Sequence, residues 1–302
     1  MAPLARWVNL QRLDLGRTKV ISVAHLANLK SLERLDLWRT RVKDLAPIAT
    51  LKNLQILSLG HTSVIDIPPL ADLVKLRSLD LSDTRIRDVT KLGRLCNLTR
   101  LGLGGTWVRD ISALAKLTNL LSLDLSDTKV TDITALAKLA NLRELKLNGS
   151  NIRDLSSFAN VRGLTNLDLS GTKVKNVSEL SVLVNLRALS LGGCAVKCLM
   201  PLANLSKLQV LNLGCTRITD IEALSGLIEL CSLDLRGTGV RDTRPIGKLL
   251  NLVSLDLAYT SVTEVAALRA LRHLEVLHLE GTRVADVTAL ASIKGLKILR
   301  EI

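Results

Sequence analysis

Aromatic residues are almost absent from this sequence: one Phe, one Tyr and three Trp make up 2% of its 302 residues. So few rings argue against a nucleic-acid binder that stacks bases on aromatic platforms. No charge-free apolar run of roughly 18 residues occurs, so no membrane span is expected. The first residues also lack the basic patch and apolar segment of a secretory signal.

Cysteine is also scarce, with five residues and therefore one left over from any pairing. An odd, small number argues against a disulfide scaffold and favours a reducing compartment. We therefore expect an intracellular protein, cytoplasmic or nuclear, unless a targeting segment lies outside this chain. Lys and Arg number 41 against 28 Asp and Glu, and the resulting charge of +13 favours anionic partners without naming one.

An apolar pattern with a period of 22 residues dominates the sequence. Leu10, Leu13 and Leu15 begin the first of thirteen copies, and the same triplet returns every 22 residues without insertion or deletion. With Leu10 as position 1, the Leu-x-Leu at positions 4 to 6 predicts a short strand with both leucines on one side. Position 13 is Asp in nine copies and precedes apolar residues at helical spacing, which predicts a capped short α or 3₁₀ turn.

Residues 59–70, which read Leu-Gly-His-Thr-Ser-Val-Ile-Asp-Ile-Pro-Pro-Leu, show the unit best. The unit resembles leucine-rich repeats of the 22-residue class, as found in bacterial internalins and in phosphatase-regulatory leucine-rich proteins, over the whole chain. The resemblance implies a single domain over residues 1–302. Its fold would be an α/β right-handed solenoid with a parallel β-sheet on the concave side and short helical turns on the convex side.

Position 9 departs from those families, which usually carry Asn there. Here it is Thr in eleven copies, with Ser150 and Cys194 completing the column. A Thr hydroxyl can donate to a backbone carbonyl, so we expect this column to be structural. Threonine-bearing repeats of this kind are similar to those of trypanosomatid proteins.

Both ends of the sequence fall within a repeat. Residues 1–10 align with residues 45–54, and Leu296 and Leu299 begin a fourteenth unit in which Glu301 stands at the third leucine position. Solenoids normally need polar caps, and none is recognisable here. We expect a segment of a longer protein, with Trp7 covering the first coil, or a chain that associates end to end.

No catalytic or cofactor motif is recognisable: the sequence has no phosphate loop, zinc-finger spacing or nucleophile elbow. Cys194 and Cys198 lie four residues apart but have no His nearby, and the four His are spread over distant repeats. We therefore expect free thiols, no metal, no cofactor and no enzymatic activity.

Charged side chains form two lines along the expected solenoid. Position 5, on the outward strand face, carries seven Asp, for which we expect pairing with Arg12, Arg34 and Arg100 at position 3. Positions 10 and 12, where the strand ends, carry fourteen Lys or Arg. These basic residues are either a solvated edge or a path for a phosphate backbone; the lack of rings makes nucleic acid the less favoured partner.

Three rings fall outside the apolar columns, and they mark the candidate partner-binding surface. Aromatic and Arg residues dominate interface hot spots. The candidate residues are Arg34, Asp36, Trp38, Arg39, His61, Arg100, Trp107 and Tyr259. The competing interpretation is that these are isolated surface rings.

The sequence therefore predicts a non-enzymatic scaffold for protein recognition that uses the concave face and the edge where the strands end. Two alternatives stay open. One is a recognition segment of a larger enzyme or secreted effector, such as a ubiquitin ligase. The other is a binder of nucleic acid or another anionic surface through the basic edge.

Overall fold

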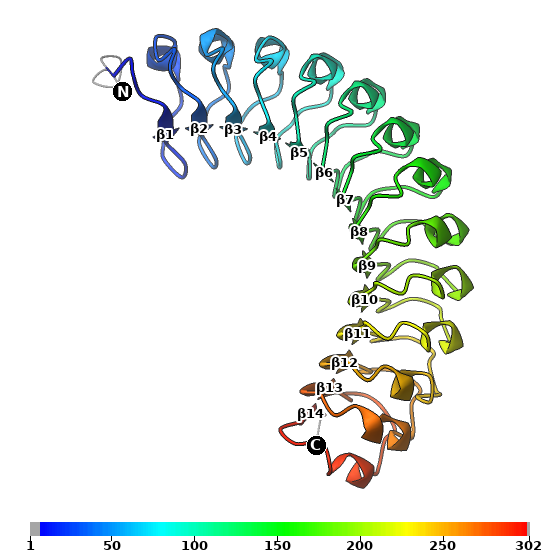
Figure 1. Cartoon of the computed structure of the whole chain (residues 1–302). Coiled ribbons are helices and arrows are strands. Elements are labelled where there is room, and N and C mark those ends of the chain that lie inside the picture. Colours follow the sequence, from blue (N-terminus) through cyan, green and yellow to red (C-terminus); the bar gives the residue numbers. More distant parts are fainter. Residues whose placement is uncertain (1–6, 301–302) are drawn as a thin grey trace. The chain divides into compact units, whose positions relative to one another are not determined.

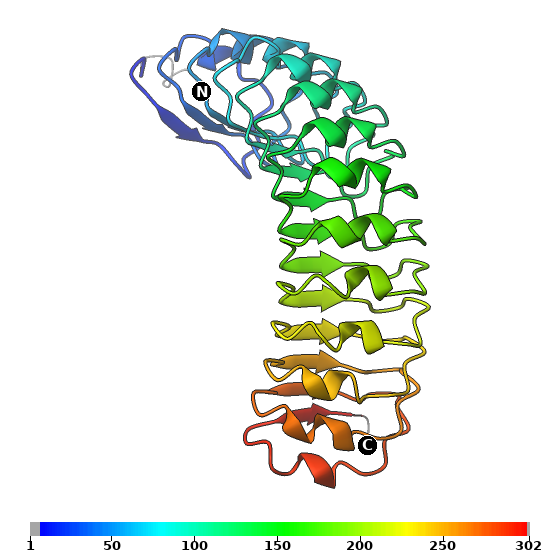
Figure 2. The ribbon, with the colours of Figure 1, turned by 45° about the vertical axis from the view of Figure 1, so that its right-hand side comes forward.

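The structure is a computed structural model that describes residues 7–300. The chain divides into two compact units, residues 1–152 (unit 1) and 153–302 (unit 2). Each unit is a stack of 22-residue coils in which a three-residue strand on one side alternates with a 3₁₀ turn on the other (Figures 1 and 2). The predicted right-handed leucine-rich-repeat solenoid is thus confirmed, and its helical turns are 3₁₀.

Unit 1 contains seven parallel strands within its described residues, and β1 to β6 each pair in register with the strand of the next coil. The strands are β1 (Arg12–Asp14), β2 (Arg34–Asp36), β3 (Ile56–Ser58), β4 (Ser78–Asp80), β5 (Arg100–Gly102), β6 (Ser122–Asp124) and β7 (Glu144–Lys146). The 3₁₀ turns are η2 (Ala24–Leu26), η3 (Ala46–Thr50), η4 (Pro68–Leu70), η5 (Thr90–Arg94), η6 (Ser112–Lys116) and η7 (Thr134–Lys138).

Unit 2 repeats the same coil. Its strands are β8 (Asn166–Asp168), β9 (Ala188–Ser190), β10 (Val210–Asn212), β11 (Ser232–Asp234), β12 (Ser254–Asp256), β13 (Val276–His278) and β14 (Lys297–Leu299). Its 3₁₀ turns are η8 (Ser156–Asn160), η9 (Ser178–Val182), η10 (Met200–Leu202), η11 (Glu222–Leu224), η12 (Ile246–Lys248), η13 (Ala266–Ala270) and η14 (Thr288–Leu290).

The core between the two layers is aliphatic, as the apolar columns predict. Leucines at positions 1, 4 and 6, such as Leu120, Leu123 and Leu125, are at most 1% exposed. Each fully buried leucine contributes roughly 1.5–3 kcal/mol relative to an exposed one. Phe158 is fully buried at position 17 in place of a leucine, so even the single phenylalanine serves the core.

The aspartate at position 13 fixes the start of the 3₁₀ turn in eight repeats, but one residue earlier than a direct N-cap. In repeat 5, Ile111 occupies the N-cap, and Asp110 Oδ1 accepts the N–H of Ser112 at 2.8 Å. This hydrogen bond, with the Ser112 side chain, holds the pKa of Asp110 below its usual value. Asp66 is an exception, because Pro68 has no N–H to donate.

The position-9 hydroxyl donates to a backbone carbonyl, as predicted, but within its own coil. Thr128 Oγ1 donates to the carbonyl of Leu125, three residues earlier, at 2.7 Å. Cys194 differs: its Sγ lies 3.1 Å from the carbonyl of Leu169 in the preceding coil. The column is structural, and it stiffens the bend after each strand.

An asparagine column that the sequence analysis did not single out joins neighbouring coils. At position 22, the side-chain nitrogen of Asn119 donates to the carbonyl of Cys96 in the preceding coil at 2.9 Å. Five further asparagines make the same bond: Asn53, Asn97, Asn141, Asn185 and Asn251. The side-chain amides that join coils therefore lie at position 22, before the strand, and not at position 9, where the resembling families usually carry Asn.

The last coil corrects the expected register. Leu277 of β13 pairs with Ile298 of β14, so Ile298, and not Leu299, takes the inner position. The coil between them is one residue short, and Gly295, at φ 78°, makes its turn. Glu301 and residues 1–6 lie outside the described residues. Trp7 is 58% exposed, so less than half of its surface can cover the first coil.

Candidate partner-binding surface

Every coil leaves its strand through the same strained turn. The residue at position 8 has a positive φ in all thirteen repeats, between 53° and 72°. Glycine fills it at little cost in six repeats, since it lacks a Cβ. Seven repeats place another residue there: Arg17, Arg39, His61, Asp83, Asp127, Cys215 and Tyr259.

Trp38, at position 7 of repeat 2, is the centre of the densest side-chain cluster on these turns. The guanidinium carbons of Arg17 and Arg39 each lie 4.7 Å from the centre of its ring. His61 meets the ring edge-on, with the ring centres 5.6 Å apart. His61 Nε2 in turn lies 3.1 Å from Asp83 Oδ2, so contacts connect the turns of four successive repeats.

The neighbouring coil leaves room for the tryptophan. A Cβ on Gly60 would lie 3.1 Å from Trp38 Cδ1 and 2.8 Å from a carboxylate oxygen of Asp80. Asp36 Oδ1 accepts the backbone N–H of Trp38 at 2.8 Å, which fixes the turn from the strand side. We call Arg17, Trp38, Arg39, His61 and Asp83 the Trp38 cluster.

The aspartates at position 5 are directed to their own backbone, and not to arginines. Like Asp36, Asp124 accepts the N–H of the residue two positions later, Ser126, at 2.9 Å. Among residues 7–300 no ion pair joins a position-5 aspartate to Arg12, Arg34 or Arg100, so that expectation is wrong. The backbone donor is already fixed by the turn, so this bond immobilises no long side chain, whereas an ion pair would immobilise an arginine.

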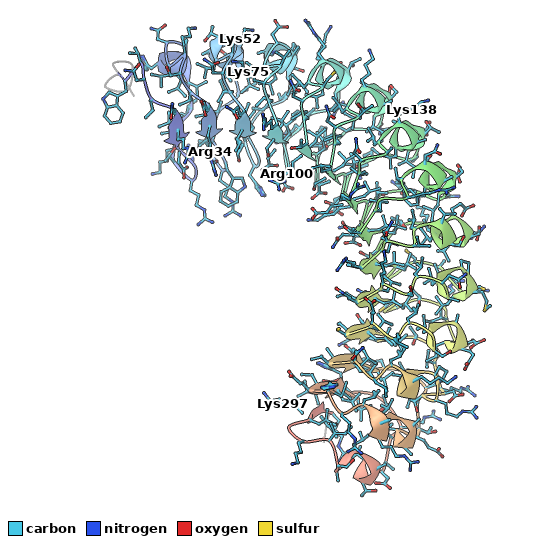
Figure 3. The ribbon with its side chains drawn as sticks, in the orientation of Figure 1. Arg34, Lys52, Lys75, Arg100, Lys138 and Lys297 are labelled. Carbon is cyan, nitrogen blue, oxygen red and sulfur yellow. The ribbon has the colours of Figure 1, made fainter. Side chains whose placement is uncertain are left out.

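Arg34 and Arg100 are exposed and extend from the strand face of unit 1, whereas Lys52 and Lys138 lie on the side of the 3₁₀ turns (Figure 3). The two arginines are three strands apart, on β2 and β5. At about 4.8 Å per strand, roughly 14 Å separates them. The strand face beside the Trp38 cluster therefore carries exposed arginines next to the position-5 aspartates.

The two remaining rings lie away from this cluster. Trp107 is 45% exposed at position 10, and the guanidinium carbon of Arg87 lies 4.6 Å from the centre of its ring. Tyr259 belongs to unit 2 and is 49% exposed, with Arg236 over its ring at 4.8 Å. The structure thus brings together Asp36, Trp38, Arg39 and His61, but not all eight candidates.

Sequence reasoning missed Arg17 and Asp83, which complete the cluster. The signal was the glycine in six copies of position 8, which marks a left-handed column along the turns. Residues in successive copies of that column are neighbours, so Arg17, Arg39, His61 and Asp83 follow one another.

The described residues offer little other chemistry. From Trp7 to Arg300, no group of three or more His, Cys, Asp or Glu side chains is placed to hold a metal ion. All five cysteines are unpaired, and burial raises the pKa of the Cys194 thiol. Within the same range no helix has the length and apolar character to cross a bilayer.

Comparison with known proteins agrees with this architecture. The family model described as "Leucine Rich repeats (2 copies)" matches residues 52–94, 96–138 and 118–160. No curated protein sequence matches the chain. An internalin of Listeria monocytogenes, inlF, shares 29% identity over 97% of this chain and 87% of its own, with a TM-score of 0.92.

Two further solved structures extend the comparison. A leucine-rich-repeat protein of Leptospira interrogans is 25% identical, covers 99% of this chain and 80% of its own, and has a TM-score of 0.91. A plant peptide hormone receptor, RGFR1, solved in complex with RGF2, is 18% identical over 98% of this chain and 63% of its own, with a TM-score of 0.73. The last likeness shows the fold alone. The chain therefore has the leucine-rich-repeat fold, and its sequence and structure are similar to those of an internalin.

Proposed function

We propose that this protein is a non-enzymatic scaffold that binds a protein partner through the strand face and the Trp38 cluster of unit 1. The leucine-rich-repeat fold commonly mediates protein recognition, and its proteins are typically not enzymes. The plant receptor in complex with RGF2 is a further example of the fold with a bound partner.

The observation that carries the proposal is the set of non-glycine residues held in the left-handed region around Trp38. Each such residue costs of order 1–3 kcal/mol, and strain of this kind concentrates at functional sites. In return, two guanidinium groups stack on the ring and hold it in place before a partner binds. A ring fixed in advance loses less side-chain freedom on binding, which favours affinity.

The charges around the cluster indicate the chemistry of the partner. Arg12 and Arg34 add two exposed cations at position 3 of β1 and β2, beside Arg17 and Arg39. The nearby Asp14 and Asp36 each spend an oxygen on a backbone N–H, of Gly16 and Trp38 respectively. We therefore propose that the partner presents carboxylates to these four arginines, beside aspartates that remain charged.

The test starts with a photo-crosslinking residue at Ile56, which is 37% exposed on β3, to identify what contacts the face. The matched control carries it at Met200, which is 67% exposed on η10. Binding of the recombinant partner is then measured for Trp38→Ala. Truncating a desolvated interface Trp typically costs about 2 kcal/mol or more, so at least tenfold weaker binding is expected, with an unchanged melting temperature.

Lys138→Ala, on the side of the 3₁₀ turns, serves as the control for Trp38→Ala and should bind like the wild type. The assignment is wrong if Trp38→Ala and Trp107→Ala both bind the partner with wild-type affinity. Equal crosslinking from Ile56 and Met200 would argue against the strand face as the binding surface.

A further inference from the structure

The basic edge at positions 10 and 12 is not uniform along unit 2. Seven repeats have a cation at position 12, and in five of them an aspartate follows directly, as in Arg153–Asp154 and Arg241–Asp242. Repeats 8 and 9 break this pattern with Lys175–Asn176 and Lys197–Cys198. Positive charge is therefore least neutralised in these two coils.

A hollow of about 470 Å³ lies at this place. Arg153, Lys173 and Lys175 line it with cationic side chains, and Gly193 and Ala195 line it with small ones. Ala195 stands at position 10, where the preceding repeat has Lys173, so the missing side chain opens space beside three exposed cations.

The polar groups that line the hollow offer hydrogen-bond donors to a ligand, and no carboxylate among the described residues lines it. Within the described chain no acidic side chain forms an ion pair with Arg153, Lys173 or Lys175. The Thr172 hydroxyl donates to Leu169, and Asn176 spends its oxygen on the N–H of Ser178, so the Asn176 amide nitrogen remains a donor. Three cations in one concavity repel each other until an anion enters.

We propose that this hollow binds a compact polyanion, a ligand that carries two or more phosphate or sulfate groups. Its volume falls within the 300–1,000 Å³ typical of small-ligand sites. Three cations and an amide donor exceed what one singly charged group requires. The site lies wholly in unit 2 and is independent of the partner-binding surface proposed for unit 1.

A nucleic acid fits the observations less well. The unneutralised stretch is short, because Asp220 and Asp242 restore the carboxylate at position 13 in repeats 10 and 11. No aromatic side chain lines the hollow, so stacked bases would have no platform.

The experiment is calorimetric titration of the full chain with inorganic tripolyphosphate at 0.05 and 0.15 M salt. We expect one saturable site, weakened by at least tenfold in Lys173→Ala/Lys175→Ala. The matched control is Arg41→Ala/Lys43→Ala, which removes two cations at the same positions of repeat 2, where Asp44 follows. The control should change affinity less than twofold.

A second variant distinguishes binding in the hollow from general electrostatic attraction to the basic edge. Ala195→Leu fills the space and keeps the net charge, so it should also weaken tripolyphosphate binding at least tenfold. Equal losses in the two double variants, or wild-type binding by Ala195→Leu, would overturn the proposal. So would tighter binding of a 20-nucleotide single strand that both double variants weaken equally.

Vesicles with and without a phosphorylated inositol lipid distinguish the source of the anion. Vesicle binding that tripolyphosphate competes away assigns the site to a lipid headgroup. Tripolyphosphate binding without vesicle binding assigns it to a soluble polyanion. Either result supports the proposed chemistry, and absence of both overturns it.

Discussion

The turns that follow the strands have one backbone conformation in both units but different residues. In unit 1 five of the seven residues in the left-handed region are not glycine, from Arg17 to Asp127. In unit 2 four of the six at position 8 are glycine, with Cys215 and Tyr259 the exceptions. The backbone is therefore not what differs between the units; the side chains placed upon it are.

The comparison shows that an isolated side chain in this column lies against a glycine of the next coil. Asp127 lies against Gly149 of the next coil, where an added Cβ would clash with its carboxylate. Tyr259 lies in the same way against Gly281, because a Cβ added to Gly281 would lie 2.5 Å from Tyr259 Cδ1. The Trp38 cluster instead has four non-glycine residues in succession, so its side chains pack on one another.

The largest effect is expected in the column that both units share. Thr128→Val removes a hydroxyl from the buried carbonyl of Leu125, which has no second donor within residues 7–300. An unpaired buried carbonyl costs about 1–3 kcal/mol of unfolding free energy. In unit 2, Thr238→Val should cost less, because the Thr238 N–H stays 3.2 Å from the carbonyl of Leu235.

Denaturant unfolding of both variants checks this difference between the two coils. Thr131→Val, at an exposed position of repeat 6, is the control and should leave stability unchanged. If all three variants unfold like the wild type, the hydroxyls do not stabilise the bend.

A smaller effect is expected from exchanging the position-8 residues of the two units. Gly237→Arg gives unit 2 the residue of unit 1 and should cost about 1–2 kcal/mol, because its φ of 66° crowds a Cβ. Arg39→Gly should change stability by less than about 1 kcal/mol. Relief of strain is offset there by the flexibility of glycine and by the lost contact with Trp38.

Thermal unfolding of both variants tests this difference in stability, and partner binding gives a second comparison. Arg39→Gly should weaken the partner complex while Gly237→Arg leaves it unchanged. A greater stability loss in Arg39→Gly than in Gly237→Arg would mean that the unit 1 turns are not strained.

The smallest effect concerns position 5. Burial, and then the charge of Asp256, raises the pKa of Asp234. Its ionised form therefore opposes folding at neutral pH, and stability improves as pH falls through the raised pKa. Asp234→Asn should melt slightly higher than the wild type at pH 7, since an Asn oxygen can accept the Arg236 N–H as Asn212 does for Gly214.

The advantage of Asp234→Asn should vanish as pH falls below that pKa, which melting curves from pH 7 to 3 would follow. The comparison in unit 1 is Asp80→Asn, which weakens bonds from the Ser82 N–H and hydroxyl and should melt lower. An advantage for Asp234→Asn that persists at pH 3 would exclude the ionic explanation.

The fold was predictable because burial acts on single columns of the repeat. Leu10, Leu13 and Leu15 and their copies specify the inner side, and the period leaves one arrangement for them. The bond from the position-9 hydroxyl was also predictable, since a buried Thr needs an acceptor. The register of β14 was not, because Ile298 and Leu299 are both apolar and only the three-dimensional path chooses between them.

The site was predictable in part. Trp38, Arg39 and His61 stand out as large residues outside the apolar columns, and the structure brings them together. Arg17 lies one repeat earlier, and its stacking on Trp38 depends on a left-handed turn that directs it along the solenoid. The Asp–Arg pairs expected at positions 5 and 3 do not form among the described residues. The backbone N–H two residues after each aspartate takes the place of the arginine as donor.

The direction of the threonine bond has a consequence for how this chain changes over generations. Thr106 donates to Leu103 within its own coil, and Asn119 reaches back to a carbonyl that every coil presents at the same place. A duplication or deletion of one whole 22-residue segment therefore leaves the threonine bonds intact, because each lies within its own coil. Unequal recombination can lengthen or shorten the array without loss of its scaffold, while the turn residues it copies supply new surfaces for selection.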